Sequence, residues 1–200
     1  CIRDRPFVAH NRHRFNEHAA STPCLDAERV YLTWSTGKRP GQVDGDPVPG
    51  IAEAIALDHA GKQAWRKELG SFMGDHGSAS SQILVEGLLF IFWDDLVTKT
   101  TTFTGLNPAD GAEVWREERP WGKDAKTTYS TPLVYQNSKG ATEVIMTSMQ
   151  FGVLSLDPKT GQELWRYDHG HKARTVGCPV ASEGVIFAAW GAGNGAKDHI

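Results

Sequence analysis

Two adjacent carboxylates form the densest candidate for metal or ligand binding in the chain. Asp94 and Asp95 directly follow Trp93 at the end of an apolar run. A calcium ion takes about six to eight oxygen ligands, so paired carboxylates are a natural starting point for such a site. Adjacent aspartates after a strand are also typical of a solvated loop. We expect that second arrangement, and we keep Asp94 and Asp95 as candidate residues of a binding loop.

A histidine and an arginine complete the set of candidate loop residues. His76 lies near Asp75 and Ser78, which are residue types of nucleophilic catalysis, but a catalytic triad needs a geometry that sequence neighbours rarely provide. Arg174 follows two histidines, and a guanidinium on a loop suits an anionic partner. We therefore expect His76 and Arg174 to act at most in binding, and we predict no catalytic residue and no metal site.

The cysteines form no redox or zinc motif. Cys1, Cys24 and Cys178 include no C-x-x-C pair. Cys24 and Cys178 each adjoin a proline that opens an apolar run, and the two runs belong to distant repeat units. Their Cα atoms should therefore lie well beyond the roughly 7 Å limit for a disulfide. We predict that both thiols are free and buried.

A motif that recurs every 50 residues must position these candidates. In each of three copies a short polar residue is followed by a glycine, a tryptophan and an arginine. A chance match at so many aligned positions is very improbable. The recurring residues are Trp65, Trp115 and Trp165; Gly61, Gly111 and Gly161; and Arg66, Arg116 and Arg166.

Each copy of the motif predicts a β-hairpin. An Asp or Asn opens the turn by capping backbone N–H groups, and the glycine supplies the positive φ that ends it. A short strand then leads to the tryptophan. The first copy is one residue shorter between Asp58 and Gly61 than the later copies, so we expect a different turn type there.

Two further strands precede each hairpin, so one unit contains four antiparallel strands. Units of about 50 residues with this content are typical of propeller blades, and no segment shows a sustained helical period. We predict an all-β fold: a single β-propeller domain over residues 1–200, formed as an arc of about three and a half four-stranded blades. Because a ring needs roughly four to eight blades, we expect the arc to be part of a larger ring. The predicted blades are about 21–66, 80–116, 129–166 and 176–200, the last of them incomplete.

Composition excludes several classes of function. The net charge is −3, from 24 acidic and 21 basic residues, and no basic cluster indicates a nucleic-acid partner. No apolar run approaches the roughly 20 residues of a membrane helix, and no signal-peptide pattern is present in this segment. We therefore expect no nucleic-acid partner and no membrane span in this segment.

The turn motif resembles the repeat of the PQQ-like (pyrroloquinoline quinone) β-propeller family, and it looks closest to uncharacterised bacterial envelope members. The segment Ser155–Trp165 matches the family pattern almost completely. The resemblance implies that each tryptophan packs between blades against a glycine-containing turn of the next repeat. The three tryptophans and three glycines would then be structural blade-docking residues. A kelch-like repeat of similar length is disfavoured because the chain lacks a recurrent Gly-Gly.

The resemblance implies two alternative functions. Some members bind no quinone, such as a lipoprotein of the machinery that assembles outer-membrane proteins. The dehydrogenases of the family hold PQQ beside calcium under a pair of adjacent cysteines, which this chain lacks. We expect a non-catalytic scaffold in the periplasm or cell envelope that binds a protein or small-molecule ligand on its loop face, with no cofactor. The alternative is part of a PQQ- and calcium-dependent quinoprotein dehydrogenase that oxidises alcohols or sugars.

Overall fold

The structure, a computed structural model, describes residues 21–35, 50–74, 78–122, 126–168 and 174–191. Within these ranges every regular element is a β-strand, which confirms the all-β prediction. None of the described segments is a helix that could cross a membrane.

The described strands form four antiparallel sheets, three with four strands and one with two. In each sheet the strands follow one another in chain order, as in a meander. The first sheet contains β1 (Cys24–Leu25), β2 (Arg29–Ser35), β3 (Gly50–Asp58) and β4 (Gln63–Phe72). The second contains β5 (Ile83–Val85), β6 (Leu88–Asp95), β7 (Thr100–Leu106) and β8 (Glu113–Pro120). The third contains β9 (Leu133–Gln136), β10 (Thr142–Ser148), β11 (Gly152–Leu156) and β12 (Glu163–Tyr167), and the last contains β13 (Val180–Ser182) and β14 (Val185–Phe187).

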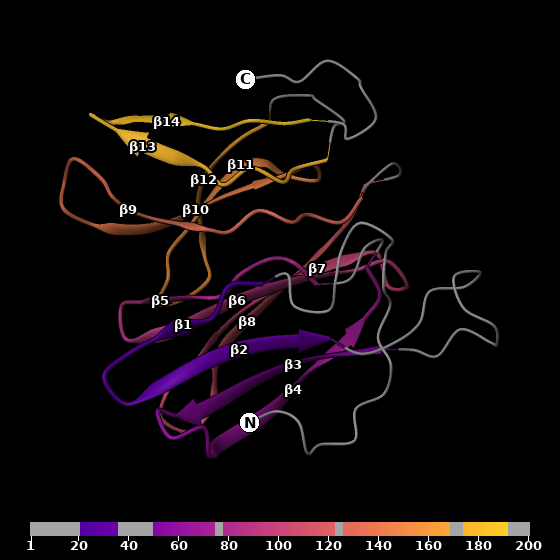
Figure 1. The fold of residues 1–200 in the computed structure, drawn as a ribbon. Coiled ribbons are helices and arrows are strands. Elements are labelled where there is room, and N and C mark those ends of the chain that lie inside the picture. Colours follow the sequence, from indigo (N-terminus) through magenta and orange to yellow (C-terminus); the bar gives the residue numbers. More distant parts are fainter. Residues whose placement is uncertain (1–20, 36–49, 75–77, 123–125, 169–173, 192–200) are drawn as a thin grey trace.

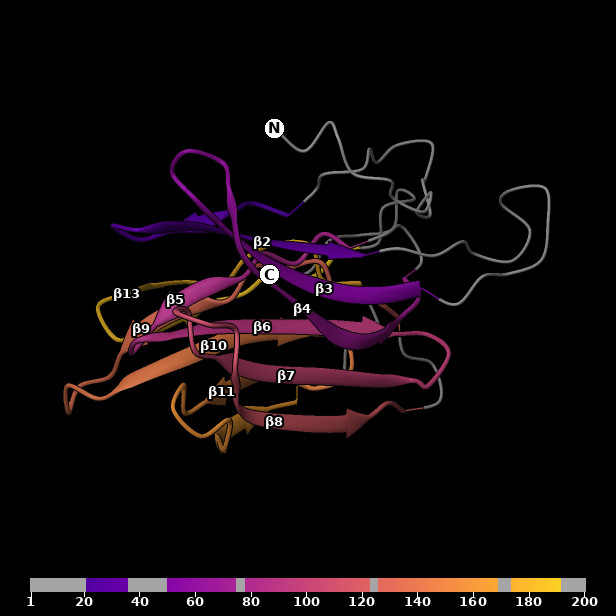
Figure 2. The same cartoon turned by 90° about the horizontal axis from the view of Figure 1, so that it is seen from below.

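The sheets are stacked in chain order, and the hairpins that join the first two strands of each sheet lie along one edge, at the left of Figure 1. Figure 2 shows the long strands of the first two sheets running in roughly the same direction in adjacent layers. This arrangement confirms the predicted arc of propeller blades. The last strand of each four-stranded sheet continues beyond the repeated tryptophan, to Phe72, Pro120 and Tyr167.

A separate apolar core fills each space between neighbouring sheets. Tyr31 and Leu69 of the first sheet pack with Leu89 and Ile91 of the second. The next core joins Phe103 of the second sheet to residues of the third, and the last core joins the third sheet to the β13–β14 hairpin. Because burying one such side chain contributes roughly 1.5–3 kcal/mol, each core strongly favours stacking of its two sheets.

The repeated tryptophans cross these cores to reach the turn of the next sheet. Nε1 of Trp65 donates a hydrogen bond to the carbonyl oxygen of Pro108 at 2.9 Å. Nε1 of Trp115 donates to the carbonyl oxygen of Pro158 at 3.0 Å. The two contacts are equivalent, since each spans 43 residues.

The glycine of each receiving turn lies directly beneath the indole. A Cβ atom added to Gly111 would come within 2.8 Å of the Trp65 ring, and one added to Gly161 would come within 2.5 Å of the Trp115 ring. Both glycines have a φ of +74°, in the left-handed region that side chains disfavour. Steric space and backbone conformation therefore both require glycine at these two positions.

A small residue lies opposite each repeated tryptophan on the neighbouring strand. Ala56 pairs with Trp65, Gly105 with Trp115, and Ser155 with Trp165. A β-bulge follows the small residue in all three sheets. A large side chain opposite the indole would occupy the space that the ring needs to lie across the sheet.

The first turn differs from the later two, as its shorter sequence predicts. The N–H of Gly61 bonds to the carbonyl of Asp58, three residues earlier, whereas Gly111 bonds to Asn107, four residues earlier. Gly61 is exposed, while Gly111 is buried. Among the described residues, no tryptophan of a preceding sheet lies on the Gly61 turn.

Trp165 makes a different contact. Its Nε1 donates to Oε2 of Glu143, in the same sheet, at 2.8 Å. Ser155 donates to the same carboxylate oxygen, and Asn137 donates to the other. These hydrogen bonds hold the pKa of Glu143 below its usual range despite its burial. The indole donor of Trp165 is thus satisfied without a turn from a following sheet.

Truncating Trp115 should weaken the stack far more than truncating its neighbour. We expect Trp115→Ala to lower the free energy of unfolding by about 3 kcal/mol, because it empties part of a core and leaves the Pro158 carbonyl unpaired. The matched control is Val114→Ala on the same strand, where the side chain is 55% exposed and the loss should stay below about 1 kcal/mol. Urea unfolding followed by circular dichroism measures both. Equal losses would contradict a special role for the indole.

Candidate functional site

The paired aspartates lie in the interior rather than in a solvated loop. Asp94 and Asp95 end strand β6, and their side chains are 4% and 2% exposed. The expectation of a solvated loop is therefore wrong. The pair is buried because β6 continues for two residues beyond Trp93, which pairs Asp94 with Thr101 and Asp95 with Thr100.

Asp94 joins the second sheet to the segment that leads into the third. The hydroxyl of Thr101 donates to Oδ1 at 2.5 Å, and the backbone N–H of Thr128 donates to Oδ2 at 2.6 Å. Desolvation by burial raises the pKa of Asp94 to about 6, although these hydrogen bonds oppose the rise.

Asp95 makes the corresponding link to the first sheet. The hydroxyl of Ser71, on β4, donates to Oδ2 at 2.6 Å. The hydroxyl of Thr98 donates to the same oxygen at 3.0 Å, and the N–H of Val97 donates to Oδ1 at 3.0 Å. The two carboxylates together connect three successive sheets.

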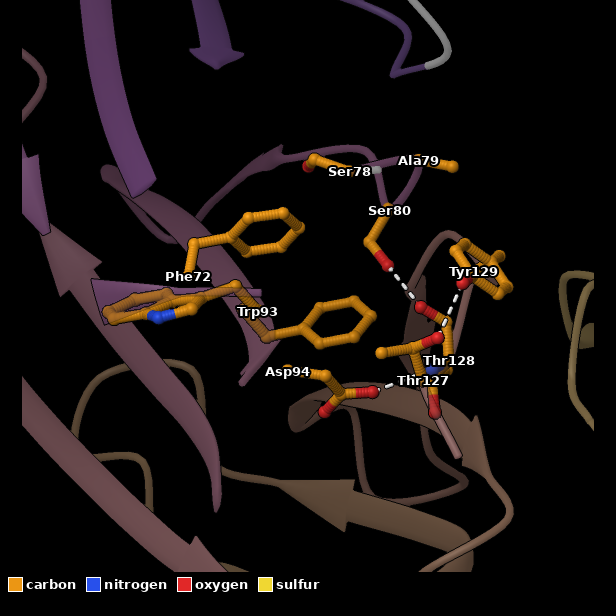
Figure 3. A pocket seen from close by; sticks show the side chains of 10 residues that line it. Phe72, Ser78, Ala79, Ser80, Trp93, Asp94, Thr127, Thr128 and Tyr129 are labelled. Atoms are coloured by element: carbon orange, nitrogen blue, oxygen red, sulfur yellow. Dashed lines mark hydrogen bonds between the residues drawn. The ribbon is translucent and has the colours of Figure 1, made fainter. Parts of the chain in front are cut away.

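A small cavity adjoins Asp94, and Figure 3 shows its lining side chains. Hydrogen bonds tie its walls together: the hydroxyl of Ser80 donates to the carbonyl of Thr128 at 3.1 Å, and the hydroxyls of Thr127 and Tyr129 bond to each other. The cavity has a volume of about 10 Å³, which is close to the minimum for one water molecule. It is therefore too small for a substrate or an organic cofactor. The lining residues are Phe72, Ser78, Ala79, Ser80, Phe92, Trp93, Asp94, Thr127, Thr128 and Tyr129.

The described residues do not fit a calcium–quinone site. Calcium takes about six to eight oxygen ligands, but the carboxylate oxygens of Asp94 and Asp95 already accept hydrogen bonds from protein donors. In the part of the chain that the structure describes, no three His, Cys, Asp or Glu side chains gather where they could hold a metal ion.

The remaining candidates lie near the cluster or outside the described residues. The guanidinium of Arg174 lies over the ring of Tyr129, 5.6 Å from its centroid, so it adjoins the cavity wall. His76 lies outside the described residues. Trp93 and Trp190 are each 6% exposed, and they belong to the apolar cores between the sheets.

The two described cysteines are free, as predicted, but neither is fully buried. Cys24 is half-buried and Cys178 is exposed, so the prediction of burial is wrong for Cys178. Cys178 lies just before the two-stranded sheet, at the junction with the third sheet, and its Sγ accepts the backbone N–H of Thr131 at 3.3 Å.

Sequence reasoning did not identify the partners that hold the sheets together. The run Thr100–Thr102 offered a signal, because a hydroxyl on the strand paired with β6 can reach its carboxylates, as Thr101 does. Nothing near Thr128 marks it as a partner for a carboxylate 34 residues earlier. Arg119 was also missed: it pairs with Glu163 of the next sheet and lies 5.7 Å from the ring centroid of Phe103.

Comparisons with known proteins agree with this fold. A family model described as outer membrane protein assembly factor BamB matches residues 48–196. The crystal structure of BamB from Moraxella catarrhalis superposes with a TM-score of 0.52 at 15% identity, covering 90% of this chain and 60% of that one. Quinohemoprotein alcohol dehydrogenase from Comamonas testosteroni gives a TM-score of 0.49 at 17% identity, covering 79% of this chain and 21% of that one. No curated protein sequence matches. The chain thus spans 60% of the BamB structure, and at this identity the likeness shows the fold.

Titration of Asp94 should make stability depend on pH. The folded pKa of about 6 lies above the ordinary value of 3.8, so the folded protein holds this proton more tightly than the unfolded chain does. The resulting stabilisation is present below about pH 4 and is lost as the pH rises through about 6. Relative to Asp94→Asn, the wild type should lose up to about 3 kcal/mol of unfolding free energy over that interval.

Urea unfolding of both proteins between about pH 4 and pH 7.5 measures this difference. Asp110→Asn, on an exposed turn, is the matched control, and its curve should run parallel to that of the wild type. If the difference in unfolding free energy between the wild type and Asp94→Asn does not change with pH, the raised pKa of Asp94 is contradicted.

The two described cysteines should differ sharply in reactivity. Cys178 is exposed, whereas burial raises the pKa of Cys24 to about 11, and the thiolate is the reactive form. Brief maleimide labelling at about pH 8, followed by peptide mapping, should modify Cys178 at least about tenfold faster. Cys178→Ser serves as the control, because it should remove this fast-labelled peptide. Faster labelling of Cys24 would refute the prediction.

Proposed function

This chain belongs to the family of the outer membrane protein assembly factor BamB, and on that premise we propose that it is a β-propeller scaffold that binds protein partners in the cell envelope. The proposal assigns no catalytic step to the described residues. Their stacked sheets would hold loops and turns at fixed positions, and a partner would recognise these loops and turns.

One observation carries the proposal. Asp94 and Asp95 are the strongest chemical candidates in the sequence, and their carboxylates are occupied in joining successive sheets. A general base or a metal ligand needs an oxygen that can face a substrate or an ion, and the neighbouring cavity of about 10 Å³ admits neither a sugar nor a quinone. These residues therefore support the architecture and leave recognition to the surface.

The surface of the stack suits recognition. The hairpins between the first and second strands of each sheet lie along one edge, and the turns 96–99 and 149–151, which join the second and third strands of the second and third sheets, lie at the opposite end. Exposed residues of both signs occur on these connections, including Glu86, Lys99 and Lys139. Because neighbouring sheets fix their spacing, a partner can contact several connections at once at a small entropic cost.

The location in the envelope rests on the family description, which names assembly of outer membrane proteins. BamB from Moraxella catarrhalis shares the fold over 90% of this chain. This description supports a component of an outer-membrane assembly machinery as the class of partner. The quinoprotein alternative has no comparable support at the acidic pair, since its carboxylates already accept protein donors and the adjoining cavity of about 10 Å³ is too small for a quinone.

The scaffold and dehydrogenase functions make opposite predictions for the full-length protein. Titration with PQQ and calcium should leave the quinone absorbance unchanged, and alcohols or sugars should cause no reduction of an artificial dye. A quinone-free protein treated in parallel supplies the baseline. Saturable PQQ binding with dye reduction would overturn the proposal.

Protein binding should be detectable at the ends of the stack. A photo-reactive residue at Lys139 or at Val97, on turns at opposite ends, should yield discrete cross-linked protein adducts in cells that make the full-length protein. The control position is Val114, which is equally open but lies on the outer strand β8. Adducts at neither end, or equal adducts at Val114, would contradict a scaffold that binds through its turns and loops.

A further inference from the structure

A groove separates the third sheet from the β13–β14 hairpin. It has a volume of about 520 Å³ and is lined by residues 133–138 on one side and 181–184 on the other. This size falls within the roughly 300–1,000 Å³ of typical ligand sites. Strands β9 and β13 are the edge strands that face it, and they belong to separate sheets.

The groove is closed at one end and open at the other. The backbone N–H of Thr131, just before β9, donates to Sγ of Cys178, just before β13. From this contact the two strands diverge toward their hairpin turns, which lie apart at the left edge of Figure 1. An extended chain could therefore enter from the turns and lie alongside β9.

The junction between the first two sheets has a contact that this junction lacks. There the N–H of Thr22 donates to Oγ of Ser81, and the next residue, Gln82, spans the junction. Nε2 of Gln82 donates to the carbonyls of Thr22 and Tyr31 at 3.0 and 2.8 Å. In the repeat alignment Ser81 corresponds to Cys178 and Gln82 to Pro179, which has no side-chain donor. The link at the Cys178 position is retained, but the amide that closes the first junction is absent.

Strand β9 directs unpaired backbone groups into the groove. The N–H of Asn137 bonds to the carbonyl of Ala141, and paired residues alternate between bonded and non-bonded positions along an antiparallel ladder. The backbone of Tyr135 therefore bonds to β10, while the N–H and C=O groups of Val134 and Gln136 point away from it. No described residue outside β9 pairs with these groups.

Strand β13 presents a similar edge on the opposite side. Its hairpin turns through Glu183 and Gly184, with φ values of +50° and +80°, as in a two-residue turn of type I′. Such a turn makes Ser182 and Val185 a hydrogen-bonded pair, so the backbone groups of Ala181 face outward. The groove is thus bordered by main-chain donors and acceptors on both sides.

The side chains of the groove are almost entirely uncharged. Leu133 and Tyr135 pack against the core beneath the groove, and Val134 is 44% exposed. Glu183, at the open end, is the one acidic residue of the lining, and none of the lining residues is basic. A chain with alternating small apolar and hydroxyl side chains matches this surface, whereas a strongly acidic chain would be repelled at Glu183.

We propose that this groove binds an extended, uncharged segment of a partner protein, which adds a strand to the edge of β9. Such β-augmentation obtains affinity from main-chain hydrogen bonds and selectivity from alternate side chains. The proposal rests on the proposed scaffold function and specifies the chemistry of one partner contact.

The test uses the full-length protein and the probe peptide acetyl-Lys-Thr-Val-Ser-Val-Thr-amide. Fluorescein is attached to the lysine side chain, so the remaining five side chains are uncharged. Fluorescence anisotropy should show saturable binding. The same peptide with N-methylated central amides keeps its side chains but loses the N–H donors, so it should bind at least about tenfold more weakly.

Two variants of Gln136 separate the contribution of its backbone N–H to peptide binding from that of its side chain. Gln136→Pro removes an outward N–H that the ladder does not use, and proline is tolerated at such edge positions. It should weaken peptide binding at least about tenfold, whereas Gln136→Ala should change the affinity by less than about twofold. Equal thermal midpoints for the two variants would show that both retain the fold.

Three results would overturn the proposal: no saturable binding up to about 1 mM peptide, equal binding of the methylated peptide, or wild-type affinity in Gln136→Pro. The outcome is separable from that of the scaffold function. If the wild type binds no peptide but Gln136→Pro still forms partner cross-links at Lys139 or Val97, the proposal for the groove is refuted. The proposed scaffold function would then still hold.

Discussion

The hydrogen bond from an indole to the turn of the next sheet is the constraint on which the rest of the structure depends. Trp65 and Trp115 reach the carbonyls of Pro108 and Pro158 across otherwise apolar cores, which have no directional preference of their own. The ring also rests on a glycine that admits no side chain. One donor and one steric condition therefore set how the first three sheets lie on one another, and the core packing between them follows from that placement.

Polar side chains between the sheets also fix how neighbouring sheets lie on one another. Asp95 accepts from Ser71 of the preceding sheet, and Asp94 accepts from Thr128 on the way to the following one. Buried carboxylates are costly unless donors surround them, and these donors come from three successive units. The acidic pair therefore maintains the spacing of the sheets. At the junction beside Pro179 the side-chain amide of Gln82 has no counterpart, and the groove that lies there makes this junction a candidate for recognition.

Local, periodic features were predictable from the sequence, and contacts between distant segments were not. The turn at Gly161, the shorter turn at Gly61 and the strand content follow from short-range chemistry repeated at a fixed interval. The burial of Asp94 depends on Thr128, whose type and position carry no signal of the contact. The exposure of Cys178 and the groove beside β9 depend on how far two hairpins diverge, which no local pattern encodes.

The direction of the indole contacts has a consequence during synthesis on the ribosome. Trp65 and Trp115 each depend on a turn that is translated 43 residues later. Until that turn is made the indole of the preceding sheet has no acceptor, so completion of the next unit stabilises the one before it. The nascent protein would gain stability stepwise from its amino terminus. Outside the ribosome, the indole of the most recently completed sheet would stay exposed until the next turn is made, and chaperones could bind it.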